Sequence, residues 1–318
     1  MPKISVIVPT ENSEDELDAL LLSIFVQAEQ DVEIIIVDNV SADGTRHLLD
    51  RYVQFDKRIR VINLSTTTGI IDCCRRGIQQ AAAPYIYLMD GTKMTYISQG
   101  CLMRLLQNLQ KHDSDFVYSS CSMFSATTMA FSRLYQIESK KFVRKKVFNH
   151  EDIAADLLFR LHLSPFGKLY KRDFLRQIQS AEFTEAFFLE CLFKAEKISY
   201  DVNGLYLCNY HTADLLVPDT VAQQRANLQI LHKYKVYEKY KDAYIYHKMR
   251  ALWLSIMYAP MEDKAQNFEA FKTNLLQEDF SQYDFDVLRK TDLYWAVRNA
   301  LKLSWPEFKE LYIGGTAQ

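Results

Sequence analysis

Glycine and proline are scarce in this chain, whose 318 residues include nine glycines and seven prolines. Long flexible linkers are therefore not expected, because such linkers are rich in these two residues. The net charge is only −2, so the chain as a whole should not attract nucleic acid. Its hydrophobic fraction of 48% and charged fraction of 25% are typical of a globular protein. The length is sufficient for one large core with an appendage.

Long apolar runs are also lacking, since none approaches the roughly 20 residues of a membrane-spanning helix. The six cysteines, including the adjacent Cys73 and Cys74, lack the spacing of a zinc site. The sequence begins Met-Pro-Lys and enters an apolar segment at once, without the pattern of a signal peptide. We therefore expect a cytoplasmic protein with reduced, buried thiols. Peripheral contact with the inner face of a membrane remains an open alternative.

Apolar strands and amphipathic helices alternate along the first part of the chain. Residues 4–10 and 32–37 are continuous apolar strands, and residues 15–27 between them have helical periodicity. Such strands predict a parallel sheet that is covered on both faces. Further strands are expected at 59–64, 85–89, 116–121 and 198–210, and helices at 71–82, 99–111 and 153–161.

Polar residues follow the first two expected strands at the same edge of the sheet. They are residues 10–12 after the first strand and the acidic turn 38–45 after the second. Ligands of open parallel sheets bind beyond the carboxyl ends of the strands. The sequence therefore predicts a ligand site at this edge.

The pattern changes near residue 218, after which only helical periodicity is found. We expect an α/β domain over 1–217 and an all-helical appendage over 218–318. Its tyrosines have mixed helical spacing, which indicates core or interface packing more than ligand stacking. The tyrosines are Tyr234, Tyr237, Tyr240, Tyr244 and Tyr246, and the expected helices are 221–237, 243–258, 265–277 and 292–303.

The motifs ISVIVPT, LLLSIFVQ and VEIIIVDNVSADGT resemble the start of the family 2 glycosyltransferases. The similarity continues through residues 58–62, 85–90, 167–172 and 204–211, and so covers about residues 1–215. It implies the GT-A fold, a doubly wound and mostly parallel sheet flanked by helices. It also implies inverting transfer from a UDP-sugar to a glycan, lipid-linked or protein acceptor, in cell-surface polysaccharide or glycoprotein glycan synthesis.

The resemblance assigns nucleotide binding to Pro9, Thr10 and Asn12 in the loop after the first strand, and to Asp38. The Asp38 carboxylate would accept hydrogen bonds from the uracil imide or the ribose, although aspartate in such a turn can also cap a helix. Arg75 matches a family arginine and would pair with a phosphate. A surface charge is an equal alternative for Arg75.

The family's Asp-x-Asp motif, which holds Mn²⁺ or Mg²⁺, is altered here. Asp90 matches the first aspartate, but Thr92 replaces the second and Lys93 follows it. A hard divalent cation prefers several oxygen ligands, so Asp90 alone is a weak metal site. Either Lys93 supplies a fixed positive charge to the diphosphate, or diphosphate binding has been lost.

The family's catalytic base, an aspartate, is also replaced. The stretch 183–193 places Cys191 at its position, and a neutral thiol with an unperturbed pKa near 8.5 is a weak base. Glu190 and Glu185 are alternative carboxylates. His211 matches a family position where it would bind phosphate, although a lone histidine before a polar turn is more often structural.

Two hypotheses follow from these replacements. One is an active, metal-independent glycosyltransferase. The other is a degenerate family member that serves as a partner, scaffold or regulatory subunit, bound to an active glycosyltransferase or to a second copy through 218–318. A basic run at 139–146 is interpreted as a solvated surface, with an anionic acceptor or membrane headgroups as its alternative partners. No motif for nucleic acid is present.

Overall fold

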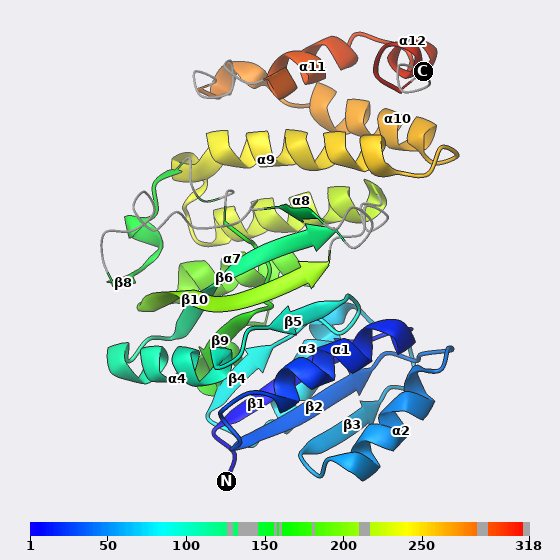
Figure 1. Ribbon diagram of the computed structural model, residues 1–318. Helices are drawn as coiled ribbons and strands as arrows, with labels where there is room; N and C mark the ends of the chain where they lie inside the picture. Colours follow the sequence, from blue (N-terminus) through cyan, green and yellow to red (C-terminus); the bar gives the residue numbers. More distant parts are fainter. Residues whose placement is uncertain are drawn as a thin grey trace. The chain divides into compact units, whose positions relative to one another are not determined.

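The computed structural model (Figure 1) divides into two compact units. The larger unit, formed by residues 1–154 and 160–210, contains the sheet, and the smaller one, formed by residues 155–159 and 211–318, contains the C-terminal helices. The structure describes residues 1–125, 130–132, 146–155, 158, 161–179, 182–209, 217–284 and 292–313.

The sheet of the larger unit is mixed, and most of its strands run in one direction. The strand order is β3-β2-β1-β4-β9-β6-β10-β5, with β7 paired to β6 and β8 paired to β10. Among these strands, β9, β5, β7 and β8 are antiparallel to their neighbours, and the others are parallel to one another. The strands are β1 (Ile4–Thr10), β2 (Val32–Asp38), β3 (Ile59–Asn63), β4 (Tyr85–Leu88), β5 (Thr95–Ile97), β6 (Phe116–Ser125), β7 (Ala130–Ser132), β8 (Val147–Phe148), β9 (Lys168–Lys171) and β10 (Ile198–Asn209).

Helices cover both faces of this sheet, which confirms the expected doubly wound α/β fold. In Figure 1, α1 and α2 lie in front of β1–β3, whereas α3 packs on β1 and β2 from the other face. Every residue of β1 is buried, as its continuous apolar sequence requires. The helices of this unit are α1 (Glu14–Phe25), α2 (Thr45–Phe55), α3 (Ile70–Gln80), α4 (Cys101–His112), α6 (Arg172–Leu175) and α7 (Thr184–Lys194).

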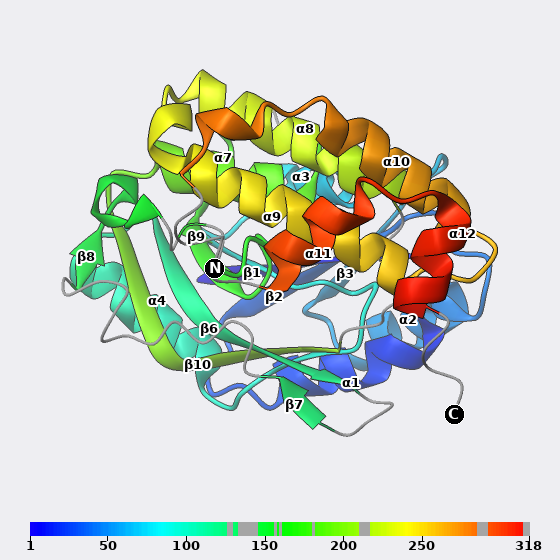
Figure 2. The ribbon, with the colours of Figure 1, turned by 90° about the horizontal axis from the view of Figure 1, so that it is seen from above.

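Some expectations from the sequence need correction. The turn after β2 continues into helix α2, which was not expected. The helix expected at 153–161 is wrong at its start, because Ile153 ends the short 3-10 helix His150–Asp152 in an extended conformation. In place of several closing strands, residues 198–209 form one long strand, β10, with a register shift between Asp201 and Leu205. Figure 2 shows β10 beside β6.

The described residues of the smaller unit from 217 onward are helical, as expected. Aromatic side chains fill its core, where Trp253 packs edge-on against Phe271, Phe308 and Tyr312. Tyr240 and Tyr244 are buried, in agreement with a packing role. None of the helices described here has the length and apolar content that a membrane crossing requires. The elements are α8 (Val217–Lys233), α9 (Tyr237–Tyr258), α10 (Lys264–Leu276), the 3-10 helix Phe280–Gln282, α11 (Asp292–Ala300), α12 (Trp305–Phe308) and the π-helix Lys309–Ile313.

Of the four non-glycine residues with positive φ in the described part of the chain, two lie where the chain leaves β1 and β2. Asn12 and Val40 have positive φ angles of 47° and 61°. Asparagine is tolerated in this left-handed region, but a β-branched residue such as valine is rarely found there. The backbone amide of Asn39 donates to the carbonyl of Thr10 at 2.8 Å and so ties the two strand ends together.

Lys168, the first residue of β9, is buried in the core and contacts β6 and α7. The Nζ atom of Lys168 donates to the carbonyls of Ser164, at 2.5 Å, and Phe166, at 3.3 Å. It also lies 4.6 Å from the ring centre of Tyr118 on β6 and 4.5 Å from that of Phe188 on α7. Among the described residues no carboxylate pairs with it, and burial lowers the pKa of Lys168 to about 7.

We expect Val40→Gly to stabilise the protein, because glycine adopts the left-handed conformation without steric cost. The gain should be about 1 kcal/mol, equivalent to a melting temperature about 2 °C higher. Differential scanning calorimetry measures it. The matched control is Val53→Gly within α2, where the same substitution should lower stability by up to about 1 kcal/mol. Equal destabilisation at both positions would show that Val40 is not strained.

Lys168 should make the stability of the protein rise with pH above neutrality. Its pKa is about 7 in the folded protein and 10.5 as an unperturbed lysine. Between these values the unfolded chain binds the additional proton, so raising the pH favours the folded state, on the order of 2 kcal/mol from pH 7 to 9. Guanidinium midpoints of the wild type and of Lys168→Met, each measured at pH 7 and pH 9, give this effect as a difference.

The control for this measurement is Lys57→Met, which replaces an exposed lysine. It should keep the pH dependence of the wild type. If Lys168→Met also kept it, the buried ammonium would not be the titrating group.

Candidate functional site

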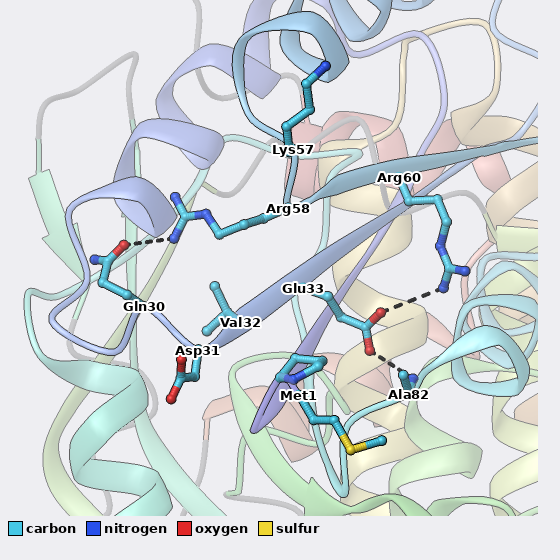
Figure 3. A pocket seen from close by; sticks show the side chains of 10 residues that line it. Met1, Gln30, Asp31, Val32, Glu33, Lys57, Arg58, Arg60 and Ala82 are labelled. Atoms are coloured by element: carbon cyan, nitrogen blue, oxygen red, sulfur yellow. Dashed lines mark hydrogen bonds and ion pairs between the residues drawn. The ribbon is translucent and has the colours of Figure 1, made fainter.

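A surface hollow of about 480 Å³ lies at the amino end of β2, opposite the expected ligand edge (Figure 3). Apart from the exposed Lys57, its charged side chains have partners within the chain. Glu33 pairs with Arg60 at 3.7 Å and accepts from the amide of Ala82 at 2.8 Å, and Arg58 pairs with Asp56 at 2.7 Å. This hollow therefore has little unsatisfied polarity to offer a ligand.

The carboxyl ends of β1 and β2 have unsatisfied polar atoms instead. Thr10 and Asp38 are direct partners across the two strands and are 1% and 0% exposed. The hydroxyl oxygen of Thr10 and the Oδ1 atom of Asp38 are buried without a hydrogen-bond partner. An unpaired buried polar atom costs about 1–3 kcal/mol, and here two such atoms lie on directly paired strand ends. A ligand with hydrogen-bond donors at this edge would remove that cost.

The second oxygen of Asp38 is held by the chain itself. Asp38 Oδ2 accepts from Arg46 Nε at 2.8 Å and from the amide of Ser41 at 3.3 Å. The alternative role of Asp38 as a helix cap is wrong, because α2 has Gly44 at its N-cap and Asp43 accepts from the amide of Thr45. The Asp38 carboxylate therefore presents Oδ1 in a fixed orientation.

The loop after β1 is fastened to the turn after β2. Asn12 is exposed, its amide donates to the hydroxyl of Ser41 at 2.9 Å, and its Oδ1 accepts from the amide of Ala42 at 2.8 Å. Pro9 is buried, and its carbonyl accepts from the amide of Gly91 at 3.0 Å, which brings the ends of β1 and β4 together. The structure thus gathers Pro9, Thr10 and Asp38 at one edge, with Asn12 at its rim.

The sequence analysis did not identify two residues whose hydrogen bonds shape this edge, Asn39 and Arg46. Asn39 Nδ2 donates to Glu11 Oε2 at 2.6 Å and to the carbonyl of Thr68 at 2.9 Å, so it joins three loops. Arg46 reaches Asp38 from the first turn of α2. Asn39 could have been predicted from its position beside Asp38. The contact of Arg46 with Asp38 could not be predicted without knowing that α2 begins at Thr45.

Asp90 lies at the end of β4 and is nearly buried. Its Oδ1 accepts from the amide of Thr92 at 3.0 Å and from the Thr92 hydroxyl at 2.7 Å. Gly91 is required here, because an added Cβ would lie 2.6 Å from the carbonyl oxygen of Pro9. Asp90 and Thr92 therefore form a closed turn beside the β1 edge.

These residues do not fit a divalent cation. Thr92 already occupies one oxygen of the single carboxylate in the motif, and Lys93 adds a positive charge next to it. Among the described residues no group of three or more histidine, cysteine, aspartate or glutamate side chains could hold a metal ion. The positive charge of Lys93 also affects His162. Burial and the positive charges of Lys168 and Lys93 lower the pKa of His162 well below its usual value.

Arg75 lies on α3 and is engaged within the chain. Its Nη1 donates to Asp72 at 2.7 Å, and its Nη2 donates to the carbonyl of Gln179 at 3.3 Å. A phosphate at Arg75 would compete with these two contacts, so its phosphate role stays a prediction. His211, and residues 139–145 of the basic run, lie outside the described residues.

The three candidates for a base lie on α7 and differ in exposure. Cys191 and Glu190 are buried at 0% and 2%, and burial raises the pKa of the Cys191 thiol well above its usual value. The Cys191 thiol therefore stays protonated at neutral pH and cannot act as a base there. Glu185 is half-buried in the first turn of α7, so of the three it has the best access to an acceptor.

Comparison with proteins of known sequence adds the family. The "Putative teichuronic acid biosynthesis glycosyltransferase TuaG" of Bacillus subtilis is 34% identical over 28% of this chain and 35% of its own length. The "Uncharacterized glycosyltransferase EpsJ" of B. subtilis is 26% identical over 65% of this chain and 61% of its own. The chain thus spans less than two thirds of either relative. The "Glycosyltransferase GlyG" of Streptococcus pneumoniae is 24% identical over 67% and 72%.

Solved structures support the fold. Residues 1–349 of S. aureus TarS, solved in complex with UDP-GlcNAc, have a TM-score of 0.61 and 18% identity to this chain, covering 94% of it and 91% of the TarS fragment. This confirms the expected GT-A-type architecture. The sequence model described as "Glycosyl transferase family 2" matches residues 5–179, which is more than half of the chain. The chain therefore belongs to glycosyl transferase family 2.

Proposed function

We propose that this protein binds a UDP-sugar at the β1/β2 edge and transfers the sugar to an acceptor hydroxyl with inversion. The observation that carries the proposal is the pair of unsatisfied buried atoms, Thr10 Oγ1 and Asp38 Oδ1, at adjacent strand ends. Uracil has an imide N–H and the ribose has hydroxyl donors, which are the groups that a buried carboxylate oxygen requires. The TarS fragment, of similar fold, was solved with UDP-GlcNAc.

The diphosphate would be stabilised by a fixed positive charge instead of a metal ion. Lys93 follows the Asp90–Thr92 turn, and Gly91 in this turn donates to the carbonyl of Pro9 on β1. A side-chain ammonium in a partly buried position offers electrostatic stabilisation of the leaving group without reorganisation of solvent. Lys93 would therefore take the role that a cation has where the motif has two aspartates.

The transfer would proceed as a single displacement. The acceptor oxygen forms a bond to the anomeric carbon while the bond from that carbon to the diphosphate breaks, and UDP leaves with the electron pair. The acceptor proton passes to a base, for which Glu185 is the best candidate because Cys191 and Glu190 are buried. The named roles of relatives, such as teichuronic acid biosynthesis for TuaG, support a cell-surface polysaccharide as the acceptor class.

The buried thiol at the base position favours a second candidate function. With Cys191 fully buried, the protein could retain the nucleotide site and lack turnover. It would then act as a partner or regulatory subunit of an active glycosyltransferase, because fold and site chemistry are independent. Donor binding and donor turnover therefore have to be measured separately.

We expect UDP to bind the wild type equally well with manganese and with EDTA, as measured by isothermal titration calorimetry. Asp38→Asn should weaken binding about 10- to 100-fold, because a hydrogen bond to a charged group contributes about 1.5–3 kcal/mol. The matched control is Asp56→Asn at the other end of α2, which should bind UDP like the wild type.

The same titration tests Lys93. Lys93→Gln should weaken the binding of UDP but not of uridine, since only UDP carries the diphosphate. Binding that requires manganese would contradict the role of Lys93, and a wild type that binds no UDP would contradict the proposed function.

Release of UDP from UDP-sugars should separate the enzyme from the binding protein. If Glu185 is the base, Glu185→Gln should lower the rate about 100-fold or more, within the range for general base catalysis, and leave UDP affinity unchanged. A coupled assay for UDP measures the rate with a panel of UDP-sugars and oligosaccharide acceptors. Cys191→Ser is the control and should keep the wild-type rate. No release by a wild type that binds UDP would favour the partner hypothesis.

A further inference from the structure

Arg46 connects the buried carboxylate of Asp38 to the surface. Its Nε lies 2.8 Å from Asp38 Oδ2, and the two side chains are 46% and 0% exposed. Within the described residues the two terminal nitrogens of Arg46 form no hydrogen bond. The guanidinium has five N–H donors in a planar fork, so four of them remain available.

The pair therefore offers an acceptor and donors side by side. Asp38 Oδ1 is an unpaired buried acceptor. The donors are the terminal nitrogens of the Arg46 guanidinium, whose Nε donates to the other oxygen of the same carboxylate. The complementary ligand has an N–H next to a carbonyl oxygen. Uracil has this arrangement at its imide, where the ring N–H lies between two carbonyl groups. Cytosine has an unprotonated nitrogen at that ring position, which would face Asp38 with a lone pair.

We propose that Arg46 is a specificity-determining residue that donates to a uracil carbonyl while Asp38 accepts from the imide N–H. This inference rests on the proposed UDP site and deepens it. A purely structural ion pair does not account for the arrangement, because it would leave Asp38 Oδ1 unsatisfied with or without Arg46.

Sulfur-substituted nucleotides test the contact atom by atom. Sulfur is a much weaker hydrogen-bond acceptor than oxygen, so 2-thio-UDP and 4-thio-UDP each remove one carbonyl partner. By calorimetry, the wild type should bind one of the two analogues about tenfold more weakly than UDP. Arg46→Ala should bind UDP about tenfold more weakly and should no longer distinguish UDP from that analogue.

Arg46→Lys is the second variant, and it keeps a positive charge beside Asp38 in case Arg46→Ala does not fold. A lysine lacks the planar fork, so it too should lose the discrimination between UDP and the thio analogue. Arg51→Ala, which replaces an exposed arginine further along α2, should keep the wild-type discrimination.

The outcomes separate the two proposals. If UDP binds and the Arg46 variants discriminate as the wild type does, Arg46 does not contact the base and the inference is wrong while the UDP site stands. If the wild type binds UDP and both thio analogues equally, the inference is wrong in the same way. If the wild type does not bind UDP, both proposals fail.

Discussion

The parallel pairing of β1 with β2 is the constraint on which the site depends. Its register sets Thr10 opposite Asp38, the last residue of each strand. Both strands are buried between helices, so the polar side chains at their ends are withdrawn from water before a ligand arrives. The ladder satisfies the backbone groups but provides nothing for Thr10 Oγ1 and Asp38 Oδ1. The unsatisfied oxygens of the proposed site thus follow from the register in which β1 and β2 end side by side.

Much of this could be predicted from the sequence, because the signals are local. Continuous apolar strands and helical periodicity identified β1, α1, β2, β3, α3 and β4 to within a few residues. The polar residues that follow β1 and β2 predicted the edge at which Thr10 and Asp38 have unsatisfied atoms. Val40 shows why a prediction from residue type can fail, since a valine occupies a left-handed position that residue preferences would not assign to it. The flanking hydrogen bonds hold it there.

The remaining features could not be predicted because they depend on contacts between distant segments. Arg46 meets Asp38 only because α2 begins directly after the acidic turn. Lys168 was part of a recognised motif, but its burial between Tyr118 and Phe188 requires the positions of β6 and α7. Similarly, the sequence could align Cys191 with the family base but could not show that it is completely buried.

The two parts of the proposed site therefore differ in what they offer a ligand. The strand-end half keeps oriented, unsatisfied oxygens, which lower the stability of the unliganded protein by about 1–3 kcal/mol each. On α7, the position that the resemblance assigns to the base holds a thiol, Cys191, one helical turn from Phe188, whose ring contacts the buried Lys168. A carboxylate at 191 would lie near that ammonium, whereas the neutral thiol leaves it with carbonyl and aromatic partners alone. Because the strand ends and α7 are separate elements, the proposed nucleotide binding does not depend on whether another residue replaces the base.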